Sequence, residues 1–191
     1  MNIAVILGSP RLSSNSALLA EEAVKASGAG EGEVKKFFLN SLSIKGCQAC
    51  YSCKSKTEFC VVKDDLTPVL AAAANADLVI LTAPIYIGDV TAQAKLFIDR
   101  TFAWFKPDFK SNKVPGRLAG GGRRMLLIFT QGNPDSSVYA KNSQHYEAYF
   151  QAQGFKTAVL TGESLLGDNV LDTRPDLVKK VRDLAAELLK N

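Results

Sequence analysis

The chain has 191 residues, of which 47% are hydrophobic and 22% are charged, and its net charge is +4. These values are typical of a globular domain and exclude a disordered chain, while the mild positive charge favours an anionic ligand over a nucleic acid. No apolar run is long enough to span a bilayer, and the first residues lack the pattern of a secretory signal. We therefore expect a single cytoplasmic domain over residues 1–191 that binds neither membrane nor nucleic acid.

The first sixteen residues predict a strand, a loop and a helix start. Residues 2–7 form a short apolar run typical of a buried strand, and Gly8, Ser9 and Pro10 then mark a turn. Residues 13–16 precede a helical pattern, so one of their hydroxyl or amide side chains is the expected N-cap. The N–H groups of such a loop and helix start favour an anion. Because the loop matches neither the dinucleotide nor the nucleoside-triphosphate glycine motif, it predicts another kind of phosphate site or a plain connection.

Strands and helices alternate along the rest of the chain. Further strands are expected at 33–39, 77–82, 125–130 and 155–161, and helices at 66–75, 90–105, 142–153 and 174–190. Asp64 and Asp65 are the expected caps of the helix at 66–75, and Pro175 suits the start of the last helix. Five apolar strands in this alternation predict an α/β fold with a doubly wound parallel sheet, strand order 2-1-3-4-5 and three α/β/α layers.

Three loops of this fold are expected to meet at one crevice. In an open parallel sheet the ligand lies beyond the carboxyl ends of the strands, at the point where the strand order reverses. With the order 2-1-3-4-5 that point lies between the first and third strands, at residues 8–16 and 83–89, with residues 130–134 beside them. This convergence favours the phosphate interpretation of the first loop.

All four cysteines lie together in a loop at about 44–63, in the order Cys47, Cys50, Cys53 and Cys60. Thiolates three residues apart on an irregular loop can each reach a different iron of one cubane, as in the bacterial ferredoxin run, which this spacing resembles in its first three members. A zinc site and a redox dithiol are the alternatives, although zinc usually takes two separated Cys-x2-Cys pairs.

Three segments together resemble the NADPH-dependent FMN reductase family, and more narrowly its iron–sulfur flavoprotein branch. They are GSPRLSSNS at 8–16, the cysteine run followed by Asp64-Asp65, and APIYIGDVTAQAKLFIDR at 83–100; the similarity continues at the level of the fold through TQGNP at 130–134. The resemblance implies a flavodoxin-like fold that holds FMN non-covalently. It also implies homo-oligomers, dimers or tetramers, in which the FMN and the cluster of different subunits exchange electrons.

The same resemblance implies a set of site residues. The expected ligands of the FMN phosphate are Ser9, Arg11, Ser14, Asn15 and Ser16. The loop against the isoalloxazine ring is expected at Pro84, Ile85, Tyr86, Ile87 and Gly88, with Gln131 and Gly132 nearby; Gln131 can bond the ring or simply make the turn. The [4Fe–4S] ligands are expected to be Cys47, Cys50, Cys53 and Cys60.

Other polar residues favour structural roles, and none stands out as a catalytic acid or base. His145, the only histidine, is expected at the surface, and Asp99-Arg100 is expected to make a structural pair or an interface contact.

Two redox functions and one binding function remain open at this stage. The first is an FMN-dependent oxidoreductase that passes electrons from ferredoxin or NAD(P)H through a cluster and FMN to an acceptor. The second is a cluster-free NAD(P)H-dependent FMN or quinone reductase, and the third is a zinc-stabilised binding module without redox activity. Bound flavin, iron and sulfide separate these three hypotheses.

Overall fold

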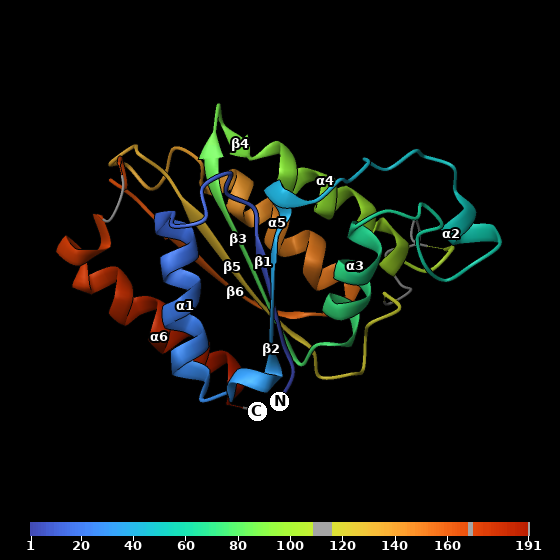
Figure 1. Ribbon diagram of the computed structural model, residues 1–191, viewed down its shortest axis with the longest axis horizontal. Helices are drawn as coiled ribbons and strands as arrows, with labels where there is room; N and C mark the ends of the chain where they lie inside the picture. The colour runs from blue at the N-terminus through green and yellow to red at the C-terminus, as the bar shows by residue number, and fades with distance from the viewer. Residues whose placement is uncertain (109–115, 168–169, 191) are drawn as a thin grey trace.

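A computed structural model of the protein describes residues 1–108, 116–167 and 170–190. Its sheet has five parallel strands in the order β2-β1-β3-β5-β6, and a short strand, β4, pairs antiparallel with the end of β3. Helices cover both faces of this sheet (Figure 1). With β4 left out of the count, the order is the predicted 2-1-3-4-5, which confirms the doubly wound, three-layer prediction.

The elements follow the predicted alternation closely. The strands are β1 (Ile3–Leu7), β2 (Val34–Phe38), β3 (Leu78–Tyr86), β4 (Asp89–Val90), β5 (Arg124–Thr130) and β6 (Lys156–Gly162). The helices are α1 (Asn15–Ser27), α2 (Ser52–Ser55), α3 (Leu66–Asn75), α4 (Ala92–Arg100), α5 (Ala140–Gln153) and α6 (Pro175–Leu189).

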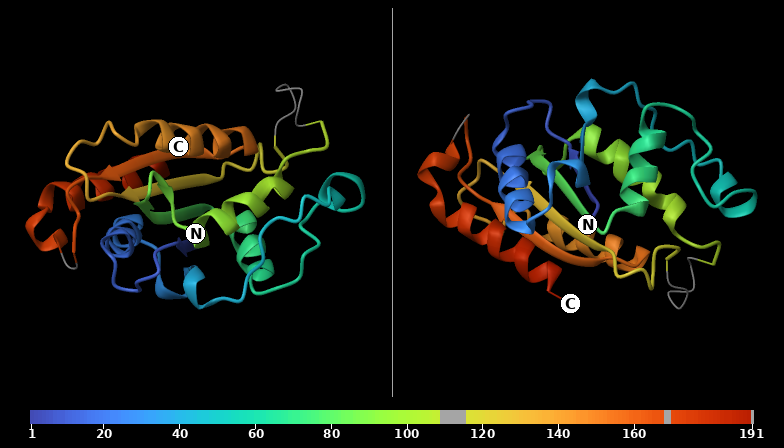
Figure 2. Two further views of the ribbon diagram at one scale, coloured as in Figure 1. Left: turned by 90° about the horizontal axis from the view of Figure 1, so that it is seen from above. Right: turned by 60° about the horizontal axis from the view of Figure 1, so that its bottom comes forward.

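Two hydrophobic cores lie on opposite faces of the sheet because successive residues of a strand point in opposite directions. Ile3, Val5 and Leu7 of β1 pack with α1 and α6, whereas Ala4 and Ile6 pack with α3, α4 and α5. Figure 2 shows the two helical layers on either side of the sheet. The loops after β1, β3, β5 and β6 all leave the same edge of the sheet, since these strands are parallel.

Several predicted boundaries were wrong. β3 does not end at residue 82 but continues to Tyr86 and turns into β4, so most of the expected loop at 83–89 is a hairpin. The helix expected over 90–105 is α4 followed by a 3₁₀ turn at Thr101–Trp104. The segment between residues 106 and 124, which the Pro-, Gly- and Lys/Arg-rich sequence predicts to be an exposed loop, lies partly outside the described residues, since 109–115 are not described.

The caps were predicted with mixed success. Ser14 is the N-cap of α1, and its hydroxyl accepts a hydrogen bond from the Ala17 N–H at 3.3 Å. Pro175 occupies the first turn of α6 as expected. Asp65 stands at the N-cap position of α3 but makes no capping bond with its side chain, because its carboxylate accepts a hydrogen bond from the Ser43 N–H instead.

The cysteine loop extends from the layer of α3 and α4, at the end of the molecule opposite α6 (Figures 1 and 2). Its only helix among the described residues is the single turn α2. None of the helices in the described part of the chain is both long enough and apolar enough to cross a membrane.

Candidate functional site

A pocket of about 220 Å³ opens at the carboxyl edge of the sheet. This volume is below the roughly 300–1,000 Å³ of typical ligand pockets. It is formed by the end of β3 and by the segments that follow β1, β5 and β6. Its lining residues are Arg11, Ser14, Asn15, Pro84, Ile85, Tyr86, Thr130, Gln131, Gly132, Leu165, Leu166 and Gly167.

The first wall of this pocket is the turn into α1, where polar side chains are buried. Ser14 and Asn15 are only 2% and 3% exposed, and the Ser14 and Ser16 hydroxyl oxygens lie 3.1 Å apart. Ser9 is also buried, and its hydroxyl accepts a hydrogen bond from the Arg11 N–H at 3.1 Å. The N-terminus of a thirteen-residue helix and several hydroxyl groups therefore lie together, an arrangement that favours an anion.

Gln131 supplies an unused hydrogen-bond acceptor in the same pocket. Its side-chain nitrogen donates to the carbonyls of Asn133 and Asp135, at 3.1 and 2.8 Å, and so shapes the turn after β5. Its Oε1 is buried and has no hydrogen-bond partner within the described part of the chain. Because a buried acceptor without a partner is costly, this oxygen fits a bound ligand that carries a donor.

The β3–β4 hairpin projects beside the pocket. Ile87 and Gly88 form its tip with positive φ angles of 49° and 84°, and the Ile87 side chain is fully exposed. Helix α5 fastens this tip, because the Asn142 amide donates to the Gly88 carbonyl at 2.6 Å and the Tyr146 hydroxyl donates to the Asp89 carboxylate at 2.6 Å. Burial and this bond raise the pKa of Tyr146.

The fourth wall, Leu165–Gly167 after β6, was missed by the sequence analysis. Asn15 connects it to the first wall, since its amide nitrogen donates to the Gly167 carbonyl at 2.9 Å and its oxygen accepts from the Val170 N–H at 3.2 Å. Leucines and a glycine are not typical ligand residues, and only their position after the last parallel strand could have indicated a role.

The structure thus brings most of the predicted FMN residues together and leaves four outside the pocket lining. Ser9 and Ser16 lie behind the first wall, and Ile87 and Gly88 lie at the hairpin tip. The bonds of Ser14 and Asn15 show that these side chains also hold the loop itself together.

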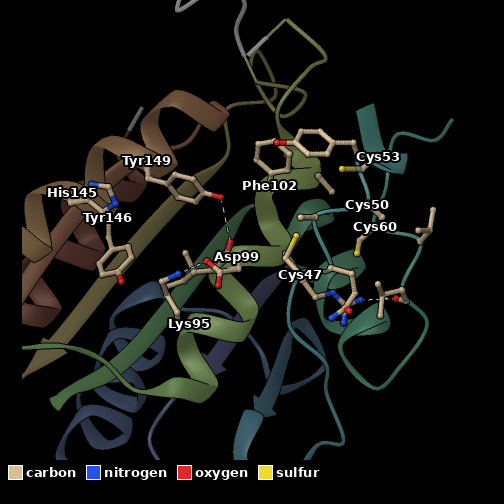
Figure 3. Close-up of a pocket in the computed structure, with 18 residues that line it drawn as sticks. Cys47, Cys50, Cys53, Cys60, Lys95, Asp99, Phe102, His145, Tyr146 and Tyr149 are labelled. Carbon is tan, nitrogen blue, oxygen red and sulfur yellow. Dashed lines mark hydrogen bonds and ion pairs between the residues drawn. The ribbon is translucent and has the colours of Figure 1, made fainter. Parts of the chain in front are cut away.

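A second pocket, of about 380 Å³, is lined by all four cysteines. Figure 3 shows His145, Tyr146 and Tyr149 of α5 across this cavity from the cysteines, with Lys95 and Asp99 of α4 between them. Cys47 and Cys50 are exposed, Cys53 and Cys60 are half-buried, and all four are free thiols. Among the residues that the structure describes, no three Cys, His, Asp or Glu side chains converge as a metal-binding group.

The backbone around Cys50 is unusual. Ala49 and Tyr51, on either side of it, have φ angles of 49° and 54°, a conformation that costs residues other than glycine roughly 1–2 kcal/mol each. Hydrogen bonds from the Ser52 backbone N–H and hydroxyl lower the pKa of the Cys50 thiol. Strain of this kind is typical of functional loops.

Three cations connect the cysteine loop to the rest of the domain. Arg100 pairs with Asp64 at 2.6 Å, which agrees with the expected structural pairing of the Asp99-Arg100 segment. Lys54 donates to the carbonyls of Phe102 and Phe105 at 2.6 and 2.7 Å, and its ammonium lies 4.2 Å from the centre of the Phe102 ring. Arg117 donates to the Cys53 carbonyl at 3.0 Å and pairs with Glu58 at 3.1 Å.

Burial and nearby negative groups have opposite effects on the pKa values of Lys54 and Arg100. Burial lowers the pKa of Lys54. Burial also opposes the charge of Arg100, but the hydrogen bond to Asp64 and the neighbouring Cys60 thiol outweigh it and raise its pKa. Positive charge next to thiols favours their anionic, metal-binding form.

Residues 1–131 match the family model described as NADPH-dependent FMN reductase, a segment that ends in the turn after β5. The chain belongs to this family. The matched segment contains the turn into α1, the β3–β4 hairpin, Gln131 and the whole cysteine loop, whereas Gly132 and Leu165–Gly167 of the first pocket lie beyond it.

Two curated members named iron–sulfur flavoprotein are similar to this chain. The protein of Methanosarcina thermophila is 32% identical over 125 residues, which cover 65% of this chain and 65% of that protein. A protein of Archaeoglobus fulgidus is 39% identical over 121 residues, which cover 62% of this chain and 54% of that protein. The alignments thus span between about half and two thirds of these relatives' length.

The fold of this family member is shared over nearly its whole length with solved flavoproteins. An FMN-dependent NADH-azoreductase from Bacillus anthracis, solved with FMN, superposes with a TM-score of 0.72 at 16% identity. The superposition covers 98% of this chain and 99% of the azoreductase. It therefore includes α5, β6 and α6, which lie beyond the family match.

Proposed function

We propose that this protein is an FMN-dependent oxidoreductase with its cofactor in the pocket at the carboxyl edge of the sheet. The observation that carries this proposal is the meeting of four loops around buried hydroxyl and amide groups, including a Gln131 oxygen with no partner in the described chain. Ligands of open parallel sheets bind at this edge, and membership of the FMN reductase family supports FMN as the ligand.

The proposed phosphate ligands are Ser9, Arg11, Ser14, Asn15 and Ser16. The exposed Arg11 would neutralise charge, and the start of α1 would direct N–H groups at the phosphate. The isoalloxazine ring would lie against residues 84–88, near Gln131 and Gly132, with the Gln131 oxygen as acceptor. Bound FMN supplies two-electron or single-electron chemistry, and the protein supplies its position and hydrogen bonds.

We also propose that Cys47, Cys50, Cys53 and Cys60 bind a [4Fe–4S] cluster. Thiolates are the usual ligands of such clusters, and all four thiols line one cavity beside the cations Lys54 and Arg100. The names of the two curated relatives support this assignment.

In this proposal electrons pass from ferredoxin or NAD(P)H through the cluster and FMN to an acceptor such as a quinone. We further propose a cytoplasmic homo-oligomer, a dimer or tetramer, that brings the two centres of different subunits together. A cluster-free NAD(P)H-dependent FMN or quinone reductase is the second candidate, and the lack of a convergent metal-binding group among the described residues favours it.

Anaerobic purification followed by a visible spectrum and by flavin, iron and sulfide analysis tests both candidates. The first predicts FMN with about four irons and four sulfides per chain, and the second predicts FMN alone. A colourless protein would contradict both.

Two pairs of variants then test the two sites separately. Arg11→Ala should weaken FMN binding about tenfold, whereas the exposed Lys179→Ala on α6 should not. Cys50→Ser should remove the iron and keep the FMN, whereas Ser55→Ala on the same loop should keep both. Unchanged FMN affinity in Arg11→Ala would mean that the phosphate lies elsewhere.

A further inference from the structure

The two ends of the cysteine loop are joined by one side chain. Arg100, the last residue of α4, donates from Nη1 to the Lys45 carbonyl at 3.3 Å and from Nη2 to the Val62 carbonyl at 2.6 Å. Lys45 precedes the first cysteine and Val62 follows the last one, so all four thiols lie between the two carbonyls that Arg100 binds. We call these contacts, together with Asp64, the neck of the loop.

Asp64 completes the neck from the other side. Both of its carboxylate oxygens accept from Arg100 Nη1 at 2.6 Å, and one of them also accepts from the Lys45 N–H at 2.8 Å. The other oxygen accepts from the Leu66 N–H at 3.1 Å. One carboxylate therefore connects the entry of the loop, the start of α3 and the end of α4.

The Arg100–Asp64 ion pair is shielded from solvent. The Arg100 side chain is fully buried and that of Asp64 is 8% exposed. Removing one partner of such a pair leaves a buried charge without compensation. The guanidinium of Arg100 reaches the carboxylate and the two carbonyls through two different nitrogens, whereas a lysine would have to serve all three acceptors from one ammonium nitrogen.

We propose that Arg100 is a positioning residue for the cysteine loop: by binding both of its ends, it brings the first and last thiols, Cys47 and Cys60, to one cavity. Ligands that are held in place before binding lose less conformational freedom when a metal centre forms. The part of this inference that concerns a cluster rests on the proposed function, and the part that concerns the loop does not.

The test compares Arg100→Met, Arg100→Lys and Asp64→Asn with a matched control, Arg123→Met. Arg123 also donates to two carbonyls, those of Ala74 and Leu118 at 2.8 and 3.3 Å, but neither carbonyl belongs to the cysteine loop. The rate at which a disulfide reagent modifies each thiol is measured in the full-length, metal-free protein by mass spectrometry. Thermal unfolding of each variant reports whether it is folded.

We expect Arg100→Met to speed modification of the half-buried Cys60 and Cys53 by about tenfold, because the loop opens more often. Cys47 and Cys50 are already exposed and should change little, which provides a control within the same molecule. Arg100→Lys and Asp64→Asn, which keep the size of the side chain more closely, should have smaller effects in the same direction. Arg123→Met should leave all four rates unchanged.

Anaerobically purified protein supplies the second measurement. In the Arg100 variants we expect lower iron and sulfide per FMN and an altered visible spectrum of the remaining cluster, with FMN content unchanged. If iron and sulfide are absent from the wild type, the proposed cluster is wrong, and the thiol rates alone decide the role of Arg100. The inference would be overturned if Arg100→Lys and Asp64→Asn left the thiol modification rates unchanged. It would also be overturned if Arg123→Met changed these rates as much as the Arg100 variants do.

Discussion

The two pockets of this protein are built in different ways. The pocket at the sheet edge is a direct product of the fold, because four parallel strands in register bring their following loops together. Apart from the exposed Arg11, the polar groups of its lining are neutral, and several are bonded to the loops themselves. The cysteine pocket has no strand in its loop and only one turn of helix. Its loop is held by Arg100 and Arg117 from other parts of the chain and by its own Lys54.

This difference has a consequence for how each pocket responds to change. A substitution at the sheet edge acts on the fold and on the ligand site together, since the same residues serve both. A substitution in the cysteine loop should alter its thiols with little effect on the sheet. Four substitutions, each paired with a second variant for comparison, test this contrast.

The largest effect is expected from Gly8→Val in the first loop. A Cβ at Gly8 would lie 2.8 Å from both the Ala94 Cβ and the Thr82 carbonyl oxygen, so α4 or the loop must move. Overpacking of this kind costs about 3 kcal/mol of unfolding free energy and should also abolish FMN binding. Urea unfolding and fluorescence titration with FMN measure the two effects.

Gly32→Ala is the matched control, because nothing lies within 4 Å of its Cβ position. Thiol reactivity in the cysteine loop should be the same in both variants at urea concentrations where they are folded. A change at the cysteines in Gly8→Val would show that the two regions are not separable.

Asn15→Leu should have the next largest effect. It removes the part-buried hydrogen bonds to the Gly167 carbonyl and the Val170 N–H, each of which contributes about 1 kcal/mol. FMN affinity should fall because the variant removes a proposed phosphate ligand and also releases the fourth wall from the first. Asn75→Ala, which loses one exposed bond on α3, is the control, and equal FMN affinity in both variants would refute the coupling of the two walls.

The burial of Tyr149, a residue of α5 that lines the cysteine pocket, can be tested at alkaline pH. Burial raises the pKa of Tyr149 on α5 to about 12. The unfolded chain releases this proton near pH 10, so the contribution of Tyr149 is complete below pH 10 and is lost as the pH rises towards 12, about 2 kcal/mol in all. Tyr149→Phe should reduce this loss of stability above pH 10 in urea unfolding at several pH values.

The Tyr149→Phe variant should still lose some stability above pH 10, because the pKa of Tyr146 is raised as well. Tyr139→Phe, on a tyrosine outside the cysteine pocket lining, serves as the control. An identical slope in Tyr149→Phe and wild type would contradict the assignment.

Features that depend on local sequence patterns were predicted, whereas features that depend on contacts between distant segments were missed. The five parallel strands, their order in the sheet and an N-cap within residues 13–16 depend on local patterns of apolar and capping residues, and all were predicted. The grouping of the cysteines could also be read from their spacing. These features are local along the chain or follow from general rules of parallel sheets.

The missed features depend on packing between distant segments. Arg100 and Asp64 are 36 residues apart, and no local pattern indicates that one arginine binds both ends of a loop. Leu165–Gly167 lies beside Asn15 only because β6 ends next to β5. The extension of β3 to Tyr86 was missed because Pro84 and Gly88 signal a turn, whereas β4 continues the pairing on the other side of it.

The smallest effect is expected from Ile87→Asn at the hairpin tip. A β-branched residue with a φ of 49° is strained, and asparagine adopts this conformation more readily, so the variant should be about 1 kcal/mol more stable. Tyr51→Asn is the counterpart in the cysteine loop, where φ is 54°. If the strain at Ile87 serves the ligand, Ile87→Asn will bind FMN more weakly while it unfolds at higher temperature. Tyr51→Asn should then leave FMN binding unchanged and alter only the reactivity of Cys50, because its loop is not part of the sheet edge. Equal effects of both variants on FMN would refute the separation of the two pockets.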